Sequence, residues 1–179
     1  MKKRHLPIFL ILLGISTILG FQFAPTSMGS SEIFTIYLVR HSEKDLESNN
    51  AANPPLTKCG EQRSEHLKSF LSDVHLDAIY STDYTRTKNT ALPTARSKGL
   101  DIQEYNTQEL EVFSKLLIDC KQDVLVVGHS NTTGVLAGLL AVEDIGEFDL
   151  DIYNRVYQVV IHKKSRRLHL FHTAFNCDD

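Results

Sequence analysis

The chain has 179 residues, of which 42% are hydrophobic and 23% charged. This length suits a single domain, and the balance of apolar and charged residues excludes a disordered chain. The formal net charge is -3, and the chain beyond the three bases at positions 2–4 is more acidic still. An acidic body lacks the electrostatic footprint of a nucleic-acid-binding protein. Any anionic ligand must therefore be held by a local cluster of bases.

The first 30 residues have the pattern of an export signal. Three basic residues at positions 2–4 precede an apolar run, and no further charge occurs before Glu32. A positive segment followed by an apolar one is typical of bacterial secretory signals. The apolar residues 6–23 approach the ~20 residues that span a bilayer, and no clear cleavage site follows them. We expect residues 1–30 to be a signal peptide or an N-terminal membrane anchor, and residues 31–179 to form a domain that is periplasmic or secreted.

The remaining chain alternates between strand-like and helix-like segments. Residues 33–39 are β-branched, aromatic and apolar on both faces, which favours a buried strand of a parallel sheet. Thr57 is a good N-cap residue after a polar loop, and Gly99 is a good residue to end a helix. Pro93 predicts a kink or an early break in the helix that ends there. Further strands are expected at 77–81, 100–104, within 123–128, near 155–162 and at 167–172, and helices after Thr57 and at 84–99, 108–120 and 132–142.

This alternation predicts the fold class. Strands separated by helices indicate an α/β fold, a three-layer sandwich in which helices flank a mainly parallel central sheet. In such sheets the chemistry gathers at the carboxyl ends of the strands.

Three predicted strands end in residues that can bind or attack a phosphoryl group. Arg40 and His41 follow the first strand, Arg86 follows the second, and His129 follows a later apolar strand. If these strands are parallel, two imidazoles and two guanidinium groups meet above the sheet. Arginine matches phosphate oxygens with two parallel donors. A neutral imidazole can attack phosphorus, and a second imidazole can donate a hydrogen bond to the phosphoryl oxygens.

A metal site is the competing interpretation of the two histidines. The adjacent arginines argue against zinc, because a cation beside a metal costs Coulomb energy. We expect no metal and no cofactor. Cys59, Cys120 and Cys177 show no C-x-x-C spacing; an oxidising compartment would permit one bridge among them, and their spacing leaves the pairing open.

Four segments carry motifs in a fixed order. They are LVRHSEK at 38–44, PLTKCGEQR at 55–63, IYSTDYTRTKNTA at 79–91 and VLVVGHSN at 124–131. They resemble the Arg-His-Gly/Ala-Glu, Pro-Leu-Thr/Ser, Ile-Tyr-Ser-Ser and Gly-His segments of the histidine phosphatase superfamily, also called the phosphoglycerate mutase-like family. The match in order and spacing covers residues 33–142. The resemblance implies a phosphoglycerate mutase-like fold and a metal-independent phosphatase.

The resemblance also implies roles for the matched residues. His41 becomes the covalent phosphohistidine, and His129 completes the pocket as the second catalytic residue. The implied substrate-binding residues are Arg40, Arg86, Ser130 and Asn131.

One feature of the family pattern does not carry over, namely the acid that protonates the leaving oxygen. Glu43, Glu104 and Glu109 are candidates, and a site without such an acid stays open. The stretch between Thr94 and Val124 is short, so we expect no capping insertion and an open site. This resembles the compact branch of the family, which acts on protein phosphohistidine, sugar phosphates or lipopolysaccharide phosphates.

The sequence therefore predicts an exported phosphatase that hydrolyses phosphomonoesters or phosphohistidine. Its substrate would be a phosphorylated small molecule, an envelope glycolipid or a phosphoprotein. The alternative is a catalytically weak phosphate-binding module of the cell envelope. Two histidines favour the enzyme, because binding alone needs only the arginine pair.

Overall fold

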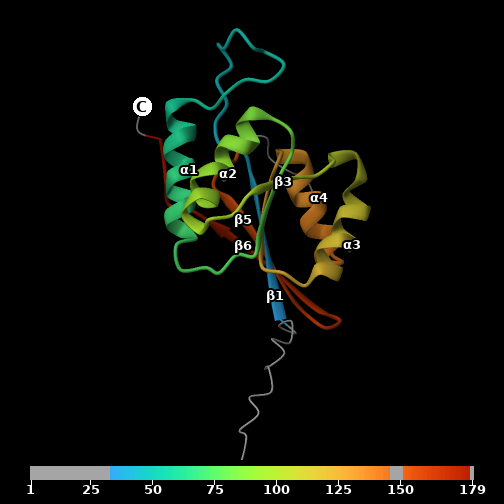
Figure 1. The fold of residues 1–179 in the computed structure, drawn as a ribbon. Coiled ribbons are helices and arrows are strands. Elements are labelled where there is room, and N and C mark those ends of the chain that lie inside the picture. Colours follow the sequence, from blue (N-terminus) through green and yellow to red (C-terminus); the bar gives the residue numbers. More distant parts are fainter. Residues whose placement is uncertain (1–32, 146–150, 178–179) are drawn as a thin grey trace, which may run out of the picture.

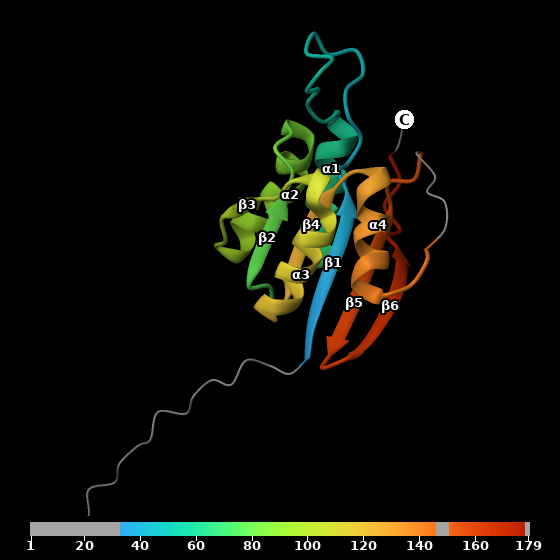
Figure 2. The ribbon, with the colours of Figure 1, turned by 90° about the vertical axis from the view of Figure 1, so that its right-hand side faces the viewer.

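Six strands form one sheet in the computed structural model, which describes residues 33–145 and 151–177. The strands, in the order β3-β2-β4-β1-β5-β6 across the sheet, are β1 (Ile33–Arg40), β2 (Ala78–Ser81), β3 (Ile102–Glu104), β4 (Val124–Gly128), β5 (Arg155–His162) and β6 (Ser165–His172). The first four in this order are mutually parallel, and β5 and β6 add an antiparallel edge (Figure 2). The mainly parallel sheet expected from the sequence is confirmed.

Helices cover both faces of this sheet, so the three-layer arrangement is confirmed as well. On one face lie α1 (Lys58–Phe70) and α2 (Thr85–Lys98), and on the other lie α3 (Leu110–Cys120) and α4 (Ser130–Ala141) (Figure 1). A short 3-10 helix, η1 (Thr107–Glu109), precedes α3. β4 shows why the strands are apolar throughout. Val124 and Val126 face the α3–α4 core, and Leu125 and Val127 face the α1–α2 core.

The helix ends agree with the sequence pattern except at three places. The side chain of Thr57 accepts a hydrogen bond from the backbone of Gly60, and α2 ends at Gly99 with a φ of 66°. The early break expected at Pro93 is wrong, because α2 continues to Lys98. Proline removes one backbone donor, and the buried Ala91 and Ala95 on either side keep both parts of the helix packed on the sheet. Two helix starts also differ. α3 begins at Leu110, two residues later than expected, and α4 begins at Ser130, two residues earlier than expected.

The loop between β1 and α1 stands above the carboxyl end of the sheet (Figure 1). Its two arms pair through a bridge between Lys44 and Leu56 and through the Asp45 N–H, which donates to the Pro55 carbonyl at 2.9 Å. The loop also reaches α2, because the side chain of Asn53 accepts a hydrogen bond from the Thr85 N–H at 2.9 Å. A residue 32 positions away thus caps the helix that carries Arg86.

A disulfide joins Cys59, in the first turn of α1, to Cys177, and Cys120 is an exposed free thiol. Within 33–145 and 151–177, no helix is long and apolar enough to cross a membrane. The export signal expected at residues 1–30 lies outside the described residues.

Candidate active site

The register of two parallel strands places the two histidines side by side. Arg40 of β1 pairs with Gly128 of β4, so the residue that follows each strand lies next to the other. The His41 N–H donates to the Gly128 carbonyl at 2.9 Å, which continues the pairing past the sheet edge. The rings of His41 and His129 are 5.4 Å apart, centroid to centroid.

These residues open into a cavity of about 320 Å³ at the carboxyl end of the sheet. All six site residues predicted from the sequence line it. The complete lining is Arg40, His41, Lys44, Tyr84, Arg86, Thr107, His129, Ser130, Asn131 and Thr132. The charged side chains in this set are all cations. Ser130 and Asn131 form the first turn of α4, so the positive end of that helix also faces the cavity.

The proton on His41 is fixed by the backbone. Its Nδ1 lies 2.8 Å from the carbonyl oxygen of Ser42, and His41 is only 3% exposed. A carbonyl oxygen can only accept, so the neutral imidazole carries its proton on Nδ1. The lone pair of Nε2 is then the ring's available nucleophile.

The proton on His129 is fixed by two threonines. Thr87 directs its hydroxyl proton at the backbone carbonyls of Thr82 and Tyr84, at 3.0 and 2.8 Å. The Thr82 hydroxyl, 2.8 Å from Thr87 Oγ1, is therefore the donor of that pair. Thr82 Oγ1 is left as an acceptor, and His129 Nε2 lies 3.1 Å from it. The hydroxyl chain thus selects the tautomer of His129 with a proton on Nε2.

Each arginine lies against a tyrosine ring. The guanidinium carbon of Arg40 is 3.9 Å from the ring centre of Tyr153, whose hydroxyl accepts a hydrogen bond from Arg40 at 3.2 Å. That of Arg86 is 4.2 Å from the ring centre of Tyr84. The same two rings also border the histidines, Tyr153 against His41 and Tyr84 against His129. Arg86 Nε is buried and has no hydrogen-bond partner, so it remains available to an anionic ligand.

Burial and neighbouring cations keep both imidazoles neutral. Burial lowers the pKa of His41 to about 3, and the positive charges of Arg40 and Arg86 act in the same direction. Burial lowers the pKa of His129 to about 4, with further contributions from Arg86, Arg40 and Lys44. Burial, together with the nearby Arg40, also lowers the pKa of Arg86. The cavity is thus built from cations that repel one another, an arrangement that a bound anion relieves.

The three candidate acids lie elsewhere. Glu43 forms a bidentate ion pair with Arg63, with its shortest contact at 2.6 Å. Glu104 is exposed and pairs with Lys88 at 2.6 Å, and Glu109 is exposed as well. Over the described ranges, the cavity lining therefore includes no carboxylate that could protonate a leaving oxygen.

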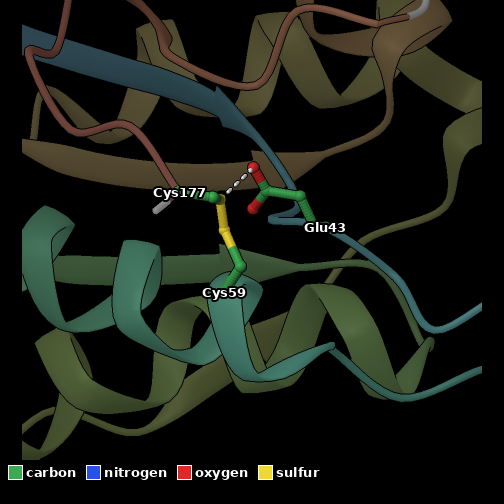
Figure 3. Close-up of side chains that lie close together, drawn as sticks. All are labelled: Glu43, Cys59 and Cys177. Atoms are coloured by element: carbon green, nitrogen blue, oxygen red, sulfur yellow. Dashed lines mark hydrogen bonds between the residues drawn. A yellow bond between two sulfur atoms is a disulfide. The ribbon is translucent and has the colours of Figure 1, made fainter. Parts of the chain in front are cut away.

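One group of possible metal ligands occurs among the described residues, and it lies outside this cavity. It consists of Glu43, Cys59 and Cys177 (Figure 3). The two sulfur atoms are bonded to each other, and Glu43 is held by Arg63. A disulfide sulfur is not a thiolate ligand, so the group as it stands does not fit a metal.

Several residues in or beside the cavity were not predicted from the sequence. Lys44 belongs to the first motif but is charged like many loop residues, and Thr82 resembles an ordinary turn residue. Tyr153 lies 113 positions after the arginine that it touches. No local pattern indicates such a contact, because it depends on how β5 returns beside β1.

Comparison with known proteins shows what this fold and its histidine–arginine cavity are similar to. Residues 36–111 match the histidine phosphatase superfamily (branch 1). Phosphoserine phosphatase 1 of Hydrogenobacter thermophilus is 35% identical over 71 residues, which are 37% of this chain and 34% of that protein. The chain thus spans about a third of the length of this relative.

Two solved structures show the same architecture. The α-ribazole phosphatase of Shigella flexneri superposes with a TM-score of 0.64 at 15% identity, over 82% of this chain and 100% of that one. The phosphoglycerate mutase of Bacillus anthracis gives 0.56 at 20% identity, over 78% and 93%. The match to the expected family covers the segment that carries His41 and Arg86, and the fold is phosphoglycerate mutase-like.

Proposed function

We propose that this chain is a phosphatase that hydrolyses phosphomonoesters through a phosphohistidine on His41. One observation carries the proposal. A buried imidazole, protonated on Nδ1 by contact with Ser42, lines a cavity whose charged side chains are all cations. Such a cavity binds a phosphate dianion and offers it a neutral nitrogen nucleophile at physiological pH.

The first step forms the bond between His41 Nε2 and phosphorus as the ester P–O bond breaks. Arg40 and Arg86 hold the equatorial oxygens, and His129 donates a hydrogen bond as negative charge shifts among them. The departing alkoxide takes its proton from water that enters the open cavity. This route suits leaving groups that are stable with little protonation.

The second step transfers the phosphoryl group to water. The water oxygen bonds to phosphorus, the P–N bond breaks, and Nε2 regains its lone pair. The water proton passes to the phosphate oxygens or to solvent. Since Nδ1 keeps its proton throughout, the Ser42 carbonyl stabilises the phosphorylated ring in both steps.

The test is a rapid-quench experiment on the full-length protein with a radiolabelled aryl phosphate and EDTA present. We expect burst release of phenol and an acid-labile label on His41, and His41→Asn should abolish both. His129→Asn should slow turnover by roughly 10²–10³-fold. Label on His129, or wild-type rates in His41→Asn, would overturn the assignment. Loss of activity in EDTA with recovery on adding zinc would overturn the proposed independence of metals.

A phosphate-binding module is the second candidate, because the described cavity lining holds no acid. Binding of vanadate or phosphate without turnover of any ester in a broad panel would favour it. Ester hydrolysis with burst kinetics would exclude it.

We further propose that the domain acts outside the cytoplasm. Residues 1–30 carry the signal pattern, and the Cys59–Cys177 bond is of a kind that persists in oxidising compartments. A fusion of residues 1–35 to a reporter that is active only after export should give signal. A silent reporter from a well-expressed fusion would contradict the proposal.

A further inference from the structure

Lys44 is a third cation of the cavity with no assigned task. It lies in the β1–α1 loop, three residues after His41, and lines the cavity with Arg40 and Arg86. No described carboxylate lies within ion-pair distance of it, whereas two lysines on the outer surface, Lys68 and Lys88, pair with acids. A lysine half-buried beside two arginines is electrostatically unfavourable unless a ligand compensates it.

The backbone of Lys44 is held in place, so its position is built into the fold. Lys44 pairs with Leu56 across the base of the β1–α1 loop, and the next residue, Asp45, donates its N–H to Pro55. The Asn53 side chain ties the same loop to the first turn of α2. Lys44 therefore lines the cavity from a segment whose backbone is held by these hydrogen bonds.

The cavity contains more positively charged side chains than one phosphoryl group requires. A phosphate dianion carries two negative charges and is matched by the bidentate forks of Arg40 and Arg86. The charge of Lys44 is then left over, at a place that also influences His129 electrostatically. A ligand that carries a second anionic group would neutralise it.

We propose that Lys44 binds a second anionic group of the substrate, so that the preferred substrates are phosphomonoesters with a further carboxylate or phosphate near the ester. This inference rests on the proposed function and narrows it. Lys44 would bind the part of the substrate that leaves, and the arginines the part that is transferred.

The experiment compares three aryl esters, whose phenolate leaving groups need little protonation. They are phenyl phosphate, 3-carboxyphenyl phosphate and 1,3-phenylene bisphosphate. Each is assayed for kcat/KM with the wild-type protein, with Lys44→Met and with Lys58→Met. Lys58 is a matched control, since it is exposed in a groove between α1 and α2, outside the cavity, and its loss changes the net charge equally.

We expect the wild-type protein to prefer both esters with a second anionic group to phenyl phosphate. Lys44→Met should reduce kcat/KM for those two esters by roughly 10- to 100-fold, the range for a charge-assisted hydrogen bond. The loss for phenyl phosphate should be only a few-fold, and Lys58→Met should leave all three kcat/KM values nearly unchanged. A carboxylate preference without a bisphosphate preference, or the reverse, identifies which anion the substrate carries.

Equal losses for all three esters in Lys44→Met would overturn the inference, since Lys44 would then serve the phosphoryl group alone. That outcome leaves the proposed function standing. A separate result would contradict the proposed function itself. This is a wild-type protein that hydrolyses none of the three esters and no other phosphomonoester.

Discussion

Thr82 and Thr87 determine which nitrogen of His129 carries the proton. Their hydroxyl protons run in one direction, from Thr82 to Thr87 and on to backbone carbonyls, which leaves Thr82 Oγ1 as the acceptor for Nε2–H. A threonine at position 82 therefore acts through His129 and touches no substrate of its own.

Replacing Thr82 by valine keeps the shape of the side chain and removes this acceptor. We expect Thr82→Val to lower kcat by about 10-fold through loss of the tautomer preference, in the range of one hydrogen bond, while KM changes little. Thr82→Ser should restore most of the activity. The direct readout is ¹⁵N NMR of the His129 ring, where the valine variant should show a mixture of tautomers. A single unchanged tautomer in that variant would contradict this role.

Acid should destabilise the protein through the two histidines. Their pKa values in the folded state are lowered to about 3 and about 4, below the value near 6.5 of an unfolded chain. Between pH 6.5 and about 4 the unfolded state binds more protons than the folded state, so the free energy of unfolding falls as the pH falls.

A variant with one of these histidines removed should show a weaker pH dependence. For His129→Gln, we expect the difference in unfolding free energy between pH 7 and pH 4.5 to shrink by on the order of 1–3 kcal/mol. Urea unfolding at the two pH values measures it. If both proteins lose equal stability, His129 is readily protonated in the fold.

The positions of the cavity residues were predictable where a motif ends a strand. Arg40, His41 and His129 follow apolar runs, and parallel pairing was enough to bring them together. The proton positions were not predictable, because they depend on contacts such as Thr82 to His129, between residues 47 positions apart. The same applies to Tyr153, whose position depends on the return of β5.

The N-terminal half of α1 connects the C-terminal segment to the β1–α1 loop. Cys59 is bonded to Cys177, and the Arg63 guanidinium donates to the Phe175 carbonyl at 3.0 Å while pairing with Glu43. Gly60 permits the close approach, since a Cβ there would overlap the Glu43 carbonyl oxygen. Glu43, whose role the sequence left open, is therefore part of the support beneath the loop that carries His41.

Loss of the disulfide should weaken the fold substantially. The bond closes a loop with a sequence separation of 118 residues. We expect Cys177→Ser, or reduction of the wild-type protein, to lower the free energy of unfolding by roughly 2–5 kcal/mol. Cys120→Ser is the control, because this exposed thiol has no partner cysteine, and it should leave the stability unchanged. Denaturant unfolding with and without reductant measures these values, and identical curves for oxidised and reduced protein would contradict the expectation.

Helix and strand positions followed closely from sequence periodicity, and the exceptions have local causes. Pro93 was expected to kink or break α2, and the helix continues to Lys98 because the buried alanines on both sides outweigh the one lost donor. The capping of α2 by Asn53 could not be expected, since the pairing crosses from one connecting loop to another helix.

The cavity residues come from segments that are far apart in the chain and meet around β1. β1 lies in the middle, hydrogen-bonded to β4 on one side and to β5 on the other. Arg40 and His41 come from its end, whereas Arg86 and His129 come from later segments of the chain. The two halves of the cavity are therefore joined by strand pairing and by the β1–α1 loop.

The covalent ring closed by Cys59 and Cys177 contains Arg86 and His129 but excludes β1 and His41, the proposed nucleophile. Leu46 is 78% exposed in the β1–α1 loop, so the chain can be divided after it. The first fragment then carries Arg40 and His41, and residues 47–179 carry Arg86 and His129. We expect the two fragments, inactive apart, to regain part of the phosphatase activity when mixed under oxidising conditions. Activity as a function of fragment concentration would then give the affinity with which β1 inserts between β4 and β5. Fragment complementation would thus measure the binding of the central strand to the rest of the fold as a dissociation constant.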